Sequence, residues 1–107
     1  MPAIRVSDRD RLYDSAGSGP AVILVHGSLS NARQWRALAE RLQDRFRVLS
    51  LDLYMTQGEG GPVVGDFGFA DDVVFVEALL AEHAPAHLVG HSYGGVVAAR
   101  AALNATR

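Results

Sequence analysis

The sequence has no cysteine and no lysine among its 107 residues. The absence of cysteine excludes disulfides, thiolate metal sites and a cysteine nucleophile. All ten basic residues are arginine, which we interpret as an effect of genome composition rather than of function. The formal net charge of −2 gives no electrostatic argument for nucleic acid or a membrane surface as a partner.

Long hydrophobic runs are also missing. No apolar stretch approaches the roughly 18 residues that a membrane-spanning helix needs. The segment from Met1 to Asp14 is charged and lacks the apolar core of a signal peptide. With 49% hydrophobic and 21% charged residues, the chain is predicted to be one small soluble domain over residues 1–107, located in the cytoplasm.

Apolar segments alternate with turn-rich segments along the chain. The run from Ala21 to Val25 is uninterrupted and rich in β-branched residues, which is typical of a strand covered on both faces. The alternation predicts an α/β fold in the order β-β-α-β-α-β-α, with a mostly parallel sheet flanked by helices. We expect strands at 11–14 (a sheet edge), 21–25, 47–53 and 86–89, and helices at 32–44, 69–83 and 93–106.

Two local patterns support the expected helix starts. Asn31 is a candidate N-cap, and Gln34 stands three residues later in the position of a capping-box partner. Asp71 and Asp72 fall in the first turn of the helix at 69–83, where negative charge suits the helix dipole.

The residues that carry chemistry are Gly90-His91-Ser92-Tyr93-Gly94, a G-x-S-x-G sequence between an expected strand and an expected apolar helix. Such a turn exposes a serine hydroxyl as a nucleophile. It also forces the serine into sparsely allowed backbone angles, so its neighbours must be small, and we expect Gly95 to let helix and strand approach closely. The alternative is a glycine-rich turn with an incidental serine.

The segment His26-Gly27-Ser28 directly follows the strand at 21–25. Acyl transfer places negative charge on a carbonyl oxygen, and backbone N–H groups stabilise that charge. We expect one donor at Tyr93, the residue after the serine, and the other at Ser28. Without Ser92 downstream, the His-Gly pair would indicate only a loop.

On these residues the chain resembles the N-terminal half of the α/β-hydrolase superfamily. The matching segments, in the family's order and spacing, are Gly17-Ser18-Gly19-Pro20, Val22 to Gly27, Asn31 to Trp35, Leu51-Asp52-Leu53 and His87 to Gly95. The resemblance implies a serine hydrolase, or a close relative, acting on an ester or related small acyl compound without a cofactor. Ser92 stands where haloalkane dehalogenases and epoxide hydrolases carry aspartate, which favours carbonyl chemistry over those two reactions.

The chain departs from the family in two places. Residues 54–60 replace a short glycine turn that borders the active-site edge in many relatives. The family's triad continues from serine to Asp or Glu and then to His, but residues 93–107 contain none of these three. Without a base a serine is a weak nucleophile, so the sequence predicts negligible hydrolase activity for the 107-residue chain.

The four histidines offer poor substitutes for the missing base. The side chains of His91 and Ser92 diverge on a sharp turn, so His91 is interpreted as a packing residue. His26 is interpreted as structural, and Asp52 as a residue that orders the loop. His83 and His87 belong near the start of the last strand, and their spacing with His91 across Pro85 argues against a metal site.

Two interpretations from different classes therefore stay open. The first is a serine hydrolase by descent, and the second is a non-catalytic binding or assembly module that holds a small anion or acyl group at the same loop and helix. A nucleotide-binding domain is disfavoured because no G-x-x-x-x-G-K-[ST] motif is present. An apolar strand at 86–89 on the sheet edge invites association, which predicts a longer natural protein or a homodimer through this edge.

Overall fold

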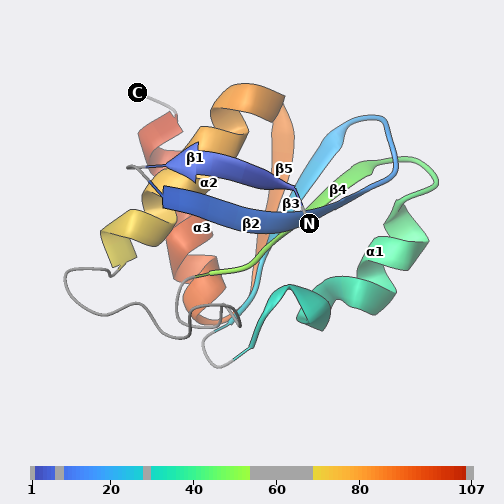
Figure 1. Ribbon diagram of the computed structural model, residues 1–107, viewed down its shortest axis with the longest axis horizontal. Coiled ribbons are helices and arrows are strands. Elements are labelled where there is room, and N and C mark those ends of the chain that lie inside the picture. The colour runs from blue at the N-terminus through green and yellow to red at the C-terminus, as the bar shows by residue number, and fades with distance from the viewer. Residues whose placement is uncertain (1, 7–8, 28–29, 54–68, 106–107) are drawn as a thin grey trace.

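The computed structural model describes residues 2–6, 9–27, 30–53 and 69–105 (Figure 1). The strands are β1 (Ala3–Val6), β2 (Arg9–Ala16), β3 (Ala21–Val25), β4 (Arg47–Leu51) and β5 (Ala86–Gly90). The helices are a 3-10 turn η1 (Ala32–Trp35), α1 (Arg36–Leu42), α2 (Phe69–His83) and α3 (Tyr93–Ala105). The α/β fold and the order of strands and helices from β2 onward are as predicted.

The strands form one mixed sheet in the order β1-β2-β4-β3-β5. Its parallel part is the predicted one: β3 lies between β4 and β5 and pairs with both in parallel. β2 pairs antiparallel with β1 and β4, so the prediction of a sheet edge at 11–14 is wrong. β1 was not predicted, because Ala3–Val6 is short, carries Arg5 and buries only Val6.

Alternating side chains of β3 explain the three layers of the molecule. Val22 and Leu24 face one side of the sheet, where they pack with a cluster that includes Trp35 and residues of α1. Ile23 and Val25 face the other side, where they join a larger cluster with α2 and α3. Figure 1 shows α1 apart from the α2–α3 pair. Burial of β3 on both faces is confirmed, since every residue of the strand is buried.

The two long helices cover one face of the sheet. α2 has the predicted bounds, and it buries Val73, Phe75, Val76 and Leu79. α3 buries only one of its sides. Val96 and Leu103, on the rest of its surface, are 59% and 56% exposed. No helix in the described ranges is long and apolar enough to cross a membrane.

β5 ends the sheet as described, with β3 as its neighbour on one side. Its Val89 is 37% exposed. The strand at 86–89 is therefore an edge strand, as expected. Association of two copies through this edge stays a prediction.

Candidate functional site

The parallel strands β3, β4 and β5 end at a common edge of the sheet. The residues directly beyond these strands include His26, Asp52 and, after His91, Ser92. In open α/β sheets, ligands bind at the carboxyl ends of the strands. A ligand site of this fold is therefore expected at this edge.

Ser92 occupies the turn between β5 and α3 and is exposed. Its φ is +56°, and among the described residues it is the one non-glycine residue with a positive φ. A left-handed backbone costs an L-residue about 1–2 kcal/mol, and such strain is concentrated at functional sites. The predicted strained turn is present, and the serine within it is exposed.

Glycines beside Ser92 allow the turn to pack closely on β3. A Cβ on Gly94 would overlap the carbonyl oxygens of Val25 and His26, and a Cβ on Gly90 would lie 2.5 Å from the Gly94 oxygen. A Cβ on Gly95 would lie 3.6 Å from the nearest atom, the Gly90 oxygen, which is an ordinary contact. Helix α3 and β5 do approach closely at Gly95, as expected, because a Cβ on Gly90 would also lie 2.5 Å from the Gly95 Cα, and Gly94 makes a second close approach, to β3.

The loop after β3 and the serine turn lie side by side. A Cβ on Gly27 would be 3.4 Å from the Ser92 Cβ and 2.9 Å from His91 Nδ1. The backbone N–H of His91 also donates to the Val25 oxygen, at 3.1 Å. The fold thus brings together the two segments that the sequence singled out, although Ser28 itself lies outside the described residues.

Hydrogen bonds fix both ends of this loop. The Gly27 N–H donates to Gln34 Oε1 at 3.1 Å, and the Ala32 N–H donates to Asp52 Oδ1 at 3.2 Å. Asn31 is the predicted N-cap and accepts from the Arg33 N–H. The capping-box role of Gln34 is wrong, because its side chain turns to the loop instead. The loop-ordering role of Asp52 is confirmed.

The backbone N–H of Tyr93 is available to a ligand at this site. Tyr93 is the first residue of α3, so its N–H has no acceptor within the helix. Across the part of the chain that the structure describes, this N–H meets no other acceptor either. The geometry is compatible with the predicted role of an oxyanion donor, which stays a prediction.

His26 is fully buried and holds the ends of β3 and β4 together. Its Nδ1 lies 2.7 Å from the Gly27 oxygen, and its Nε2 accepts from the Leu53 N–H at 3.0 Å, which fixes the Nδ1–H tautomer. Burial lowers the pKa of His26 below its ordinary value of 6.5, against weaker raising effects of the Gly27 carbonyl and of Asp52 and Asp72. His26 is therefore a neutral structural residue, as predicted, and both of its nitrogens are in use.

Acidification is expected to destabilise the fold through His26. Between the lowered folded pKa and 6.5, the unfolded chain binds a proton at His26 that the folded chain does not. The free energy of unfolding should thus be highest above pH 6.5 and fall below it, by up to about 1.4 kcal/mol per pH unit from this residue. Urea titrations at several pH values test this.

The matched variants for that titration are His26→Gln and His87→Gln. The first is expected to flatten the pH dependence, and the second, at an exposed position, controls for the loss of a histidine as such. Equal slopes in the wild type and in His26→Gln would show that His26 is not the group responsible.

Among the described residues, no histidine side chain makes a hydrogen bond to Ser92. His91 is exposed and lies over Gly27, and His87 meets the edge of Phe46 with ring centroids 6.2 Å apart. Within the described ranges, no group of three His, Asp or Glu side chains is placed to hold a metal ion.

A buried ion pair beside the site was not foreseen. Arg11 Nη2 of β2 donates to Asp72 Oδ1 of α2 at 2.7 Å, and both side chains are almost fully buried. The Tyr93 hydroxyl donates to Asp72 Oδ2, also at 2.7 Å. The first-turn aspartate that the sequence assigned to the helix dipole is thus mainly the partner of Arg11.

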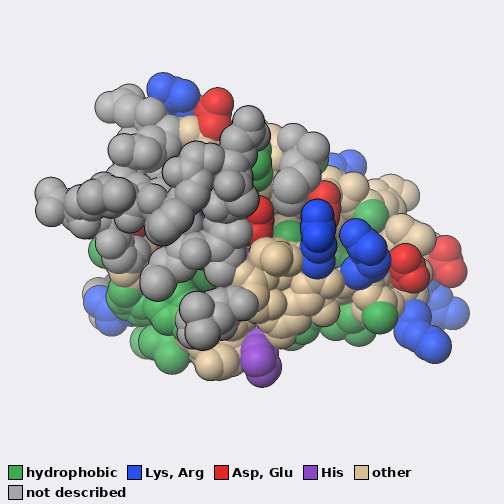
Figure 2. All heavy atoms as spheres, turned by 60° about the horizontal axis from the view of Figure 1, so that its bottom comes forward, with side chains coloured by type: hydrophobic (Ala, Val, Ile, Leu, Met, Phe, Trp, Pro, Cys, Tyr) green, Lys and Arg blue, Asp and Glu red, His purple; other side chains and the backbone are tan. Residues whose placement is uncertain are grey.

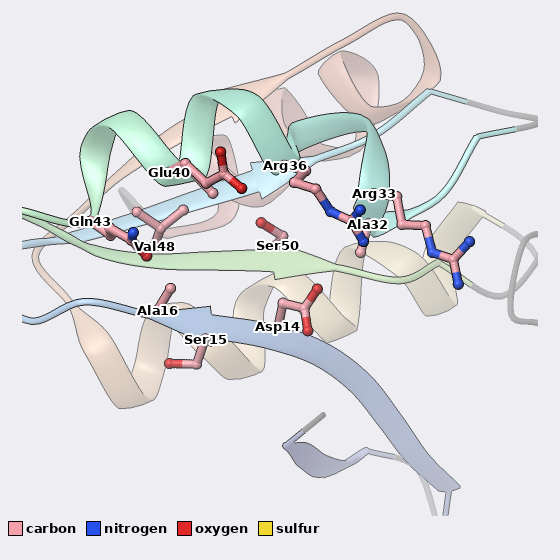
Figure 3. Close-up of a pocket in the computed structure, with 11 residues that line it drawn as sticks. Asp14, Ser15, Ala16, Ala32, Arg33, Arg36, Glu40, Gln43, Val48 and Ser50 are labelled. Atoms are coloured by element: carbon pink, nitrogen blue, oxygen red, sulfur yellow. The ribbon is translucent and has the colours of Figure 1, made fainter.

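A separate hollow of about 210 Å³ lies between α1 and the sheet (Figure 3). Its lining includes Arg33, Arg36, Asp14, Glu40 and Ser50. Because both signs of charge line this hollow, it has no electrostatic preference for an anion or a cation, and we assign it no function. Figure 2 shows arginine and acidic side chains lying side by side over the α1 end of the molecule.

Comparison with known proteins gives a family that agrees with the α/β fold of this chain. The model of the alpha/beta hydrolase family matches residues 22–106. Pimeloyl-[acyl-carrier protein] methyl ester esterase of Methylococcus capsulatus is 38% identical over 90 residues, which are 83% of this chain and 34% of that protein. The protein of the same name from Vibrio campbellii is 37% identical over 95 residues, 87% of this chain and 35% of that one.

Solved structures share the fold over nearly the whole of this chain. An alpha/beta hydrolase from Sphaerobacter thermophilus has a TM-score of 0.80 at 28% identity, covering 96% of this chain and 40% of that one. An alpha/beta hydrolase fold protein from Burkholderia ambifaria has a TM-score of 0.83 at 28% identity, covering 98% and 39%. The chain belongs to the alpha/beta hydrolase family. It spans about a third of the length of the curated relatives it matches.

Proposed function

We propose that Ser92 is the nucleophile of a serine hydrolase that cleaves a carboxylic ester or a related small acyl compound. The observation that carries the proposal is the backbone of Ser92, an exposed serine with a φ of +56° at the carboxyl edge of the parallel strands. The tight packing of Gly94 on β3 supports it, because it leaves the turn no room to relax. The relatives named as methyl ester esterases favour an ester as the substrate class.

The proposed reaction is acyl transfer in two steps. Ser92 Oγ attacks the ester carbonyl carbon while its proton passes to a base, and the carbonyl oxygen becomes an oxyanion. The N–H groups of Tyr93 and, by resemblance, Ser28 would stabilise that oxyanion, each contributing roughly 2.7–4 kcal/mol. The alcohol then leaves with a proton, and water releases the acid from the serine.

The base is the part that these 107 residues do not supply. His26 uses both nitrogens within the fold, and residues 93–107 contain no Asp, Glu or His. Loss of the triad histidine can cost on the order of 10⁶ in turnover, while binding and the oxyanion donors retain roughly 10³–10⁴ over water. We therefore propose that the 107-residue chain alone is nearly inactive. We also propose that the substrate is a small acyl compound and that the protein works in the cytoplasm.

A fluorophosphonate probe tests the proposal. The 107-residue chain is expected to take up one label, at Ser92, at a rate at least about 10³-fold below that of a complete serine hydrolase, because the base is missing. Peptide mapping by mass spectrometry locates the label, and the variant Ser92→Ala is the control.

Each contrary result identifies the part of the proposal that fails. Labelling at other serines but not at Ser92 would reject Ser92 as the nucleophile. Labelling of Ser92 at the rate of a complete hydrolase would show that a base lies within these residues.

A further inference from the structure

Arg11, Asp72 and Tyr93 form a line of hydrogen bonds from the sheet to the residue after Ser92. Arg11 reaches Asp72 Oδ1 and the Tyr93 hydroxyl reaches Asp72 Oδ2, each over 2.7 Å. Both oxygens of one carboxylate are thus engaged, by groups from β2 and from α3. Asp72 itself is on α2, so a single side chain connects three elements of the fold.

The arginine has two further contacts on α2 besides the carboxylate. Arg11 Nη1 donates to the Asp71 oxygen at 3.3 Å, and the guanidinium carbon lies 4.3 Å from the centre of the Phe75 ring. A guanidinium at this distance over an aromatic face is attracted by it. The guanidinium that pairs with Asp72 is therefore also held by two other groups of α2, the Asp71 carbonyl and the Phe75 ring.

The tyrosine acts as a donor to Asp72. Burial raises the pKa of the Tyr93 hydroxyl, and the hydrogen bond to Asp72 raises it further. The phenol is therefore protonated at neutral pH. The Tyr93 ring also meets the edge of Phe69, with centroids 6.3 Å apart, so the ring is held along its length as well as at its tip.

Fixing the Tyr93 side chain also fixes its backbone. The ring is rigid, its hydroxyl is tied to α2, and its Cα begins α3 directly after Ser92. The N–H groups of Gly95 and Val96 both donate to the Ser92 oxygen, so the same turn connects the serine to the helix. Movement of the Tyr93 side chain would tilt this first turn and redirect the Tyr93 N–H.

We propose that Arg11 and Asp72 are positioning residues that act through the Tyr93 hydroxyl to aim the Tyr93 backbone N–H at the oxyanion formed at Ser92. This inference rests on the function proposed above. A buried ion pair by itself is weak evidence for stability, because burying two charges offsets much of their attraction. Its position next to the serine turn is what gives this pair a role in orientation.

The test compares Tyr93→Phe and Asp72→Asn with the wild type in the rate of fluorophosphonate labelling at Ser92. The exposed Ser18 in the same molecule serves as the internal reference. Both variants are expected to lower the Ser92 rate about tenfold, less than the roughly 10²–10³-fold loss when an oxyanion donor is removed outright. Hydrogen exchange of the Gly95 and Val96 amides, read by NMR, is expected to become faster in both.

Asn104→Ala is the matched control. Asn104 Nδ2 of α3 donates to Glu77 Oε2 of α2 at 2.8 Å, so this variant also removes a hydrogen bond between the two helices, at the far end from Ser92. It is expected to leave the Ser92 rate unchanged. Tyr93→Phe keeps the ring and carries the test if Asp72→Asn does not fold.

The outcomes separate this inference from the proposed function. If wild-type Ser92 reacts faster than Ser18 but Tyr93→Phe matches Asn104→Ala, the positioning role is rejected and the proposed function stands. If wild-type Ser92 reacts no faster than Ser18, the proposed function fails, and hydrogen exchange then decides whether the Tyr93 hydroxyl positions the turn. If Tyr93→Phe left the exchange of the Gly95 and Val96 amides unchanged, the positioning role of the Tyr93 hydroxyl would be rejected as well.

Discussion

Asp72→Ala is expected to lower the free energy of unfolding by about 3–5 kcal/mol, because it leaves the buried Arg11 guanidinium without its carboxylate. Arg11 is 1% exposed, so water cannot replace the lost partner. A loss of this size is a large fraction of the stability of a small domain. Urea denaturation followed by circular dichroism measures it.

Two control variants isolate the effect of burial. Asp10→Ala breaks the ion pair of Asp10 with Arg5, whose N–O distance is 3.2 Å and whose side chains are 63% and 66% exposed. It is expected to change stability by less than about 1 kcal/mol. The double variant Arg11→Met/Asp72→Leu removes both buried charges and is expected to recover at least half of the loss. A small effect of Asp72→Ala, similar to that of Asp10→Ala, would contradict this account of the pair.

Gly94→Ala is expected to cost about 3–5 kcal/mol, since its Cβ would overlap the backbone oxygens of Val25 and His26. These are main-chain atoms of β3 and of the loop that follows it, and they cannot move aside as a flexible side chain would. Either α3 must separate from β3, or the chain must unfold. Thermal and urea unfolding report the loss.

Gly95→Ala is the neighbouring control. The added Cβ would make an ordinary contact at 3.6 Å, and alanine is preferred over glycine in a helix by about 0.5–1 kcal/mol. Gly95→Ala is therefore expected to leave stability unchanged or to raise it slightly. If both substitutions were tolerated equally, the packing described for Gly94 would be wrong.

Elements with a strong local signal could be predicted from the sequence alone. The bounds of β3 and α2 agree with the prediction, because an unbroken apolar run rich in β-branched residues marks the first and Pro85 closely follows the second. β1 has no such signal, since charge interrupts its four residues. Leu38 shows the limit of helical spacing as evidence for burial: it has the spacing of a core residue but is 38% exposed.

The candidate site could be predicted only in part. The G-x-S-x-G sequence predicts a strained serine turn, and the φ of Ser92 agrees. The distinction between Gly94 and Gly95 depends on where β3 lies, which no local pattern states. Arg11 and Asp72 are 61 positions apart, so nothing near either residue reveals their pairing. Ser28 and residues 54–60 lie outside the described residues, and their predicted places in the site stay predictions.

We propose that this chain carries a positioned serine without its base. The direct measurement is the rate of Ser92 acylation by p-nitrophenyl acetate as imidazole is added, with site-resolved mass spectrometry and the exposed Ser18 as reference. Imidazole can act as the missing general base. We predict that the ratio of Ser92 to Ser18 acylation rises with imidazole in the folded chain and not in urea. A ratio that stays near one at every imidazole concentration would contradict the claim.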